Sequence, residues 1–182
     1  MTVATMWSPE LYQRAVRFAA ERHASQTVPG TELPYLLHVT QVAAEVMRGL
    51  AVEPVATPDL AVACALLHDT VEDTATTMAE LTAAFGADVG RGVAALSKDP
   101  QLAKADQLDD SLRRIRACPR EVWAVKLADR ITNLQRPPPR WSAAKRRQYQ
   151  AEARRIHAAL ADGHGALAAR LAACIDAYAA YL

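Results

Sequence analysis

The sequence lacks a long apolar run, and this absence argues against a membrane protein. Its longest purely apolar stretch, residues 61–67, is far shorter than the ~20 residues that a membrane-spanning helix needs. The first ten residues, "MTVATMWSPE", also lack the basic start and the apolar core of a signal peptide. We therefore expect a soluble, cytoplasmic protein without a membrane partner.

The sequence also has little net charge and few cysteines. Because the formal net charge is +1, no global basic field points to a nucleic acid polymer as partner, and an anionic ligand must be held by local charges. Cys64, Cys118 and Cys174 are odd in number and far apart, which argues against a disulfide framework and a cysteine-based zinc site. A chain of 182 residues suits one compact domain.

Apolar residues repeat at helical spacing along the chain, whereas the alternating pattern of β-hairpins is missing. Residues 61–67 indicate a helix that is buried on every side. The expected helix starts are Ser8-Pro9, Thr57-Pro58, a capping box of Thr77 and Glu80, Pro119 and Ser142. The first helix is expected to end near residues 29–30. The helix that begins at Pro119 must end at prolines 137–139. The sequence thus predicts an all-α, compact single-domain helical bundle of about eight to ten helices.

The stretch "LLHDTVEDT", residues 66–74, crowds a histidine and three carboxylates at the end of the buried helix. If the helix continues, His68 lies one turn from Glu72, and Asp69 lies one turn from Asp73. The carboxylates repel one another, so a positive group is expected beside them. His68 with Asp69 suits a divalent metal such as Mn, Fe or Zn better than Ca. An isolated pair of this kind is more often structural, with the histidine buried and the carboxylates solvated.

His38 and Asp129 complete a metal-binding set. Each has a structural alternative, because His38 precedes an apolar helical stripe and Asp129 can pair with Lys126 or Arg130. Together with His68 and Asp69, however, they offer two imidazoles and two carboxylates from three predicted helices. Such a set leaves metal positions open for water and substrate, as hydrolytic metal sites require.

The ordered pattern of His, His-Asp and Asp resembles the HD-domain metal phosphohydrolases, an all-helical superfamily. The segments "PYLLH", "HDTVEDT" and "KLADRITN" resemble the hydrolase domain of the RelA/SpoT homologues, and the resemblance covers nearly the whole chain. It implies that residues 1–182 form a single HD-type domain without a synthetase or regulatory domain, as in the small alarmone hydrolases. The implied reaction removes pyrophosphate from the 3′ position of guanosine tetra- and pentaphosphate, (p)ppGpp.

The resemblance also assigns roles residue by residue. The implied ligands of Mn²⁺, with other divalent transition metals left open, are His38, His68, Asp69 and Asp129. The implied catalytic acidic pair is Glu72 and Asp73. The implied contacts to the nucleotide alarmone substrate are Lys98, Asn133, Arg130 and Tyr149, each of which also has a purely structural reading. A homodimer is left open.

One departure from the family concerns the substrate. Val28 and Pro29 stand where relatives carry a basic pair, and neither side chain can donate to a phosphate. Adenosine alarmones, (p)ppApp, or another nucleotide phosphate therefore remain alternative substrates. An HD nucleotidase that releases phosphate, and a metal-dependent nucleotide binder without turnover, are the alternative functions.

Three histidines lie outside the implied metal set. His23 matches the "AxxxHxxQ" motif of the family, but it could equally brace the neighbouring loop. His157 and His164 lie in the polar carboxy-terminal part and are expected to be exposed.

Overall fold

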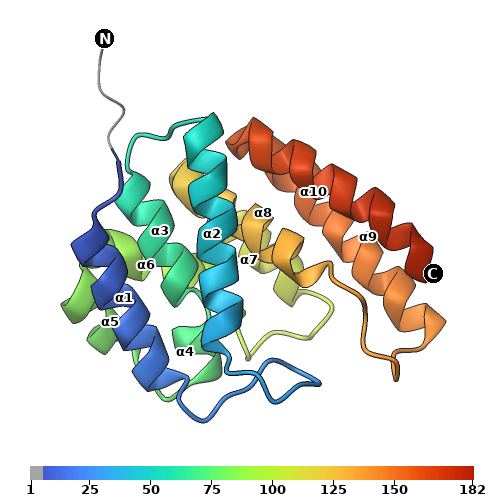
Figure 1. Cartoon of the computed structure of the whole chain (residues 1–182), viewed down its shortest axis with the longest axis horizontal. Helices are drawn as coiled ribbons and strands as arrows, with labels where there is room; N and C mark the ends of the chain where they lie inside the picture. The colour runs from blue at the N-terminus through green and yellow to red at the C-terminus, as the bar shows by residue number, and fades with distance from the viewer. Residues whose placement is uncertain (1–5) are drawn as a thin grey trace.

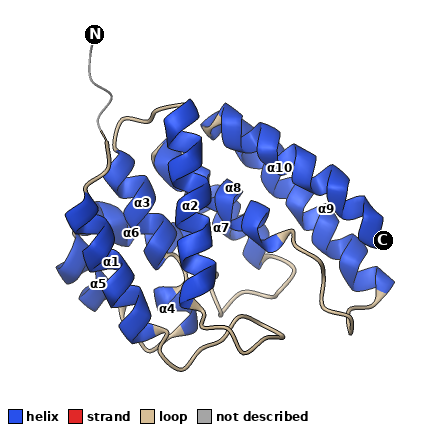
Figure 2. Ribbon diagram, viewed as in Figure 1, coloured by secondary structure: helices blue, strands red, loops and turns tan. Residues whose placement is uncertain are grey.

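The computed structural model describes residues 6–182, which form a helical bundle (Figure 1). The helices are α1 (Pro9–Arg22), α2 (Leu36–Val52), α3 (Pro58–Leu67), α4 (Thr70–Asp73), α5 (Met78–Phe85), α6 (Ala87–Leu96), α7 (Gln107–Arg116), α8 (Arg120–Asn133), α9 (Ala143–Leu160) and α10 (Gly165–Tyr178), with short 3-10 helices at Ala161–Gly163 and Ala179–Tyr181. Within residues 6–182 there is no strand, only an isolated bridge between Thr27 and Pro34 (Figure 2). The all-α prediction is confirmed.

Helix α3 lies at the centre of the core, as its apolar sequence predicts. It packs against α1, α2, α6 and α8, and the residues from Leu60 to Leu67 are all buried. Helices α9 and α10 run side by side along one flank and pack against α8 (Figure 1). Among the described helices, none has both the length and the apolarity to cross a membrane.

Most of the predicted caps are present. The Ser8 hydroxyl accepts from the Leu11 N–H at 3.2 Å, Thr77 and Glu80 form the capping box, and Ser142 caps α9. The prediction for Thr57 is wrong in detail. Its N–H and hydroxyl both donate to one carboxylate oxygen of Glu121, each at 2.8 Å, so the side chain does not cap α3 but joins it to α8.

Helix α1 ends at Arg22, several residues before the predicted end near residues 29–30. The segment that follows folds back on itself, because the Val28 N–H donates to the Leu33 carbonyl and the Tyr35 N–H donates to the Gln26 carbonyl, both at 2.9 Å. Pro29 disfavours a helical conformation at the residue before it, and Gly30 takes a positive φ of 83°. The segment therefore forms a turned loop that leads into α2.

The helix expected to run through residues 68–73 is interrupted. Helix α3 ends at Leu67, and the Thr70 hydroxyl donates to the Leu67 carbonyl. The Nδ1 atom of His68 lies 2.9 Å from the Ala65 carbonyl oxygen. Because these side chains occupy carbonyls that backbone N–H groups would otherwise use, α3 stops and the short helix α4 begins after a turn.

The prediction that His164 is exposed is wrong, because its side chain is fully buried. Its Nδ1 atom accepts from the Leu167 N–H at 3.3 Å, which caps α10. Its Nε2 atom lies 2.9 Å from the Glu53 carbonyl oxygen at the end of α2. His164 thus ties the beginning of α10 to the end of α2.

We predict that Leu66→Ala lowers the free energy of unfolding by about 3 kcal/mol, because it leaves a cavity in the fully buried α3. Urea denaturation measures this loss. The matched control, Leu33→Ala, removes a side chain that is 52% exposed and should change stability by about 0.5 kcal/mol or less. A loss below about 1 kcal/mol for Leu66→Ala would contradict the central position of α3.

Candidate active site

Three helical segments bring the predicted metal ligands together. His38 lies in the first turn of α2, His68 and Asp69 lie in the turn between α3 and α4, and Asp129 lies in α8. His38, His68 and Asp129 are buried, and Asp69 is partly buried. The packing of α2, α3 and α8 against one another therefore determines the geometry of the cluster.

The donor atoms have the spacing of a metal centre. The Nε2 atom of His68 lies 3.0 Å from Oδ2 of Asp69, and Nε2 of His38 lies 3.5 Å from the same oxygen. Oδ1 of Asp129 lies 3.6 Å from Nε2 of His38 and 3.8 Å from Nε2 of His68. Ligands that share one ion lie roughly 3 to 3.5 Å apart. Nε2 of His68 is buried without a hydrogen-bond partner among the described residues, and the donor atoms of His38, His68 and Asp69 all lie within 4.8 Å of one another, so these three residues fit a divalent metal ion.

Neighbouring groups donate hydrogen bonds to the two predicted carboxylate ligands. The Tyr35 hydroxyl donates to Oδ2 of Asp69 at 2.6 Å. Oδ2 of Asp129 accepts from Lys126 Nζ at 3.0 Å, and Oδ1 accepts from the Asn133 amide at 2.5 Å. Asp129 thus pairs with Lys126, which is the structural alternative considered from the sequence, and it also lies beside both histidines. Asn133, which the resemblance implies as a substrate contact, thus also donates to a predicted metal ligand.

The charges in the cluster shift its pKa values strongly. Burial by itself lowers the pKa of His68, but the adjacent Asp69 and Asp129 carboxylates outweigh it and raise the pKa to about 9. Burial by itself raises the pKa of Asp129, whereas Lys126 and His68 hold it at about 2. The pKa of Asp69 is likewise held well below its usual range against the effect of burial, first by His68. Without metal, the cluster therefore contains an imidazolium between two carboxylates at neutral pH.

The two acidic residues of α4 have different partners. Glu72 accepts from the Lys98 N–H and from Lys98 Nζ, each at 2.8 Å. Asp73 accepts from Nε2 of Gln26 at 2.9 Å. Burial lowers the pKa of Lys98, but the hydrogen bond and charge of Glu72 outweigh it and raise the pKa. Lys98, implied as a substrate contact, is therefore a charged partner of the acidic pair.

A polar pocket of about 380 Å³ opens over the cluster. All four implied substrate residues line it, as do Glu72 and Asp73. Its cationic residues are Lys98, Lys104, Lys126, Arg130 and Lys145. Sequence reasoning did not assign Lys104 or Lys145 to the site, because single lysines in a loop and at a helix start carry no motif. Val28 and Pro29 are not among the residues that line the pocket.

Arg130 is a candidate anion contact. Its guanidinium lies 4.4 Å from the centre of the Tyr149 ring, which stacks beneath it. Its Nε and Nη1 atoms are buried without partners among the described residues, and Nη2 lies 3.8 Å from the Glu152 carboxylate. A guanidinium with unused donors in a pocket is suited to bind a phosphate.

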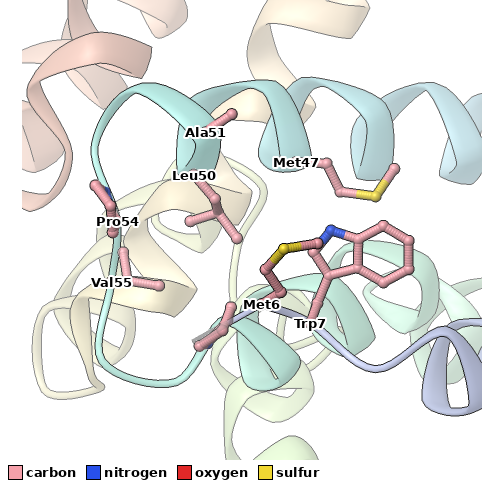
Figure 3. Close-up of a pocket in the computed structure, with 8 residues that line it drawn as sticks. Met6, Trp7, Met47, Leu50, Ala51, Pro54 and Val55 are labelled. Atoms are coloured by element: carbon pink, nitrogen blue, oxygen red, sulfur yellow. The ribbon is translucent and has the colours of Figure 1, made fainter. Parts of the chain in front are cut away.

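A second pocket has a different character (Figure 3). It has a volume of about 260 Å³ and is lined by apolar side chains: Met6, Trp7, Met47, Leu50, Ala51, Pro54, Val55 and Pro58. None of these side chains titrates, so the pocket offers no group for acid–base or metal chemistry. The polar pocket is the candidate active site.

The chain is similar to proteins of known activity. The HD-domain family model matches residues 15–167. Guanosine-3′,5′-bis(diphosphate) 3′-pyrophosphohydrolase MESH1 of Danio rerio is 39% identical over 139 residues, which cover 74% of this chain and 75% of that protein. The MESH1 protein of Xenopus tropicalis is 35% identical over 144 residues, covering 76% and 78%. A solved structure of a metazoan orthologue of SpoT that hydrolyses ppGpp superposes with a TM-score of 0.81 at 26% identity, covering 95% of this chain and 98% of that one.

We predict that metal binding displaces a proton from His68, because the pKa of this histidine is about 9 in the metal-free cluster. The apparent affinity for a divalent metal should therefore rise by up to about tenfold between pH 7 and pH 8. Calorimetry in two buffers with different ionisation enthalpies counts the released protons. An affinity that is equal at both pH values, with no proton release, would contradict the charge state deduced for His68.

Proposed function

The chain belongs to the HD-domain family, and we propose that it is a metal-dependent hydrolase that removes the 3′-pyrophosphate of guanosine tetra- and pentaphosphate. The observation that carries this proposal is the placement of Glu72 and Asp73 beside the His/Asp cluster in one cation-lined pocket. The MESH1 relatives, named for this activity, support the choice of substrate. A nucleotide substrate also agrees with the cytoplasmic location expected from the sequence.

We propose that His38, His68, Asp69 and Asp129 hold Mn²⁺. Two imidazoles and two carboxylates form a mixed nitrogen and oxygen donor set that suits Mn²⁺ and neighbouring divalent transition metals. When bound, such a metal lowers the pKa of a water ligand and polarises a phosphoryl oxygen. The hydrogen bonds of Tyr35, Lys126 and Asn133 hold the carboxylates of Asp69 and Asp129 in the orientation in which they would bind the metal.

The acidic pair handles the protons of the reaction. One carboxylate of Glu72 and Asp73 positions the attacking water and accepts its proton. The water oxygen forms a bond to the proximal phosphorus, and the bond from that phosphorus to the ribose 3′-oxygen breaks. The 3′-oxygen takes up a proton, and pyrophosphate leaves. Lys98 holds Glu72 through two hydrogen bonds, so this carboxylate is kept in place during the reaction.

The cations of the pocket suit a polyphosphorylated nucleotide. Lys104, Arg130 and Lys145 line the pocket without being bonded to the metal ligands, so they are available to phosphates at either end of the substrate. Tyr149 presents an aromatic face beneath Arg130. Val28 and Pro29, which stand where relatives carry a basic pair, do not line the pocket. Phosphate binding therefore rests on the cations that do line it.

We predict that the protein with Mn²⁺ releases pyrophosphate from ppGpp. Separate incubations with ppGpp, ppApp and deoxynucleotides, followed by measurement of pyrophosphate and phosphate, test this. Pyrophosphate from ppApp at a higher rate would assign the adenosine alarmone. Phosphate instead of pyrophosphate would identify another HD phosphohydrolase, and binding without any product would identify a nucleotide sensor. No pyrophosphate from any alarmone would overturn the proposal.

We predict that Glu72→Gln keeps its metal but loses at least about 100-fold in kcat, because the substitution removes the charge and the proton acceptor while keeping the size. Asp129→Ala should lose the metal as well, because a donor oxygen disappears. Metal content by atomic absorption and steady-state kinetics separate the two effects. The control Glu21→Gln changes an exposed residue of α1 and should behave as wild type. Full activity in Glu72→Gln would show that Glu72 is not part of the catalytic pair.

A further inference from the structure

A chain of two hydrogen bonds connects the end of α1 to the acidic pair. His23 follows the last residue of α1, and its side chain is buried. Its Nδ1 atom lies 2.6 Å from Oε1 of Gln26, and Nε2 of Gln26 lies 2.9 Å from Oδ2 of Asp73. Neither His23 nor Gln26 takes part in the chemistry proposed above. Gln26 contacts the acidic pair directly, and His23 is connected to it through Gln26.

The surroundings of His23 determine which of its nitrogens carries the proton. Its Nε2 atom is buried and has no hydrogen-bond partner within residues 6–182. A neutral imidazole with its proton on Nε2 would bury this donor unpaired, and it would set the lone pair of Nδ1 against the side-chain amide oxygen of Gln26. The proton therefore belongs on Nδ1, where it is donated to Gln26.

This proton fixes the orientation of the Gln26 amide. Because the amide oxygen faces His23, the amide nitrogen faces Asp73 and donates to its carboxylate. A flipped amide would place its oxygen against the carboxylate oxygen, which is repulsive. The backbone of Gln26 is also held, since its N–H donates to the His23 carbonyl and its carbonyl accepts from the Tyr35 N–H, both at 2.9 Å.

The same histidine also supports the metal cluster. Its ring centre lies 5.0 Å from that of Tyr35, whose hydroxyl donates to Asp69. His23 therefore contacts the partner of a metal ligand on one side and the partner of Asp73 on the other.

We propose that Gln26 is a positioning residue for Asp73 and that His23 fixes the orientation of its amide. The role in turnover rests on the hydrolase function proposed above, whereas the orientation of the amide does not. Glu72 receives two hydrogen bonds from Lys98, but Gln26 provides the only side-chain hydrogen bond to Asp73 among the described residues. Loss of Gln26 therefore leaves Asp73 free to rotate away from the reacting water.

The kinetic test compares Gln26→Met, which keeps the length of the side chain without the amide, with wild type. We expect kcat to fall at least tenfold, while KM, metal affinity and the thermal midpoint stay near the wild-type values, because neither the ligands nor the core changes. The matched control is Gln13→Met, on the exposed face of α1. A wild-type kcat for Gln26→Met would overturn the proposal.

Two variants of His23 separate orientation from packing. His23→Asn places an amide nitrogen near the position of Nδ1, so it keeps a donor to Gln26 and should retain most of kcat. His23→Leu keeps an apolar group but no donor, and should lose kcat as Gln26→Met does. Equal kcat values for the two variants would overturn the role of His23.

A measurement without substrate tests the arrangement itself. In metal-free protein, ¹⁵N NMR of the imidazole nitrogens, assigned with His23→Asn, should show the proton of His23 on Nδ1. A proton on Nε2 would overturn the proposal whether or not the enzyme is active. If wild type releases no pyrophosphate from any alarmone, the proposed function fails, and the NMR result still decides whether His23 orients Gln26.

Discussion

The structure of the site depends on the burial of two carboxylates, Asp69 and Asp129, beside two imidazoles. Burying a charge is unfavourable unless it is paired and hydrogen-bonded. Both aspartates meet this condition, because Tyr35 donates to Asp69 and Lys126 donates to Asp129. The two carboxylates also face His38 of α2 and His68 at the end of α3, so the cluster joins α2, α3 and α8, the helices that form the centre of the core. The same attraction therefore stabilises the helix packing and produces a cavity with the charge and spacing that a divalent cation needs.

The acidic pair of α4 shows how neighbouring residues in a sequence acquire different surroundings. Glu72 lies against the charged Lys98 from the loop after α6, whereas Asp73 lies against the neutral amide of Gln26 from the loop after α1. The two adjacent carboxylates are therefore held by partners of different charge from two separate loops. The break between α3 and α4 allows both side chains to point into the same pocket.

Some local predictions failed for a common reason. The end of α3 at Leu67, the early end of α1 and the burial of His164 all arise from side chains or loop backbone that bond to main-chain groups. Helical periodicity indicates which face of a segment is apolar. It does not indicate where side chains compete with backbone N–H groups for backbone carbonyls. The polar composition around His164 suggested exposure, whereas the histidine replaces the usual serine or threonine as a cap.

The sequence by itself determined the helical fold, most helix starts, the family and the types of residue at the site, because these depend on apolar spacing and on motifs within short segments. It also proposed His38, His68, Asp69 and Asp129 as one set, although they come from segments far apart. Only the tertiary structure decided that Lys98 pairs with Glu72, that Gln26 pairs with Asp73 and that five cations line one pocket. Hydrogen bonds form over about 3 Å, so these partnerships depend on how separate helices and loops pack, which no local pattern encodes.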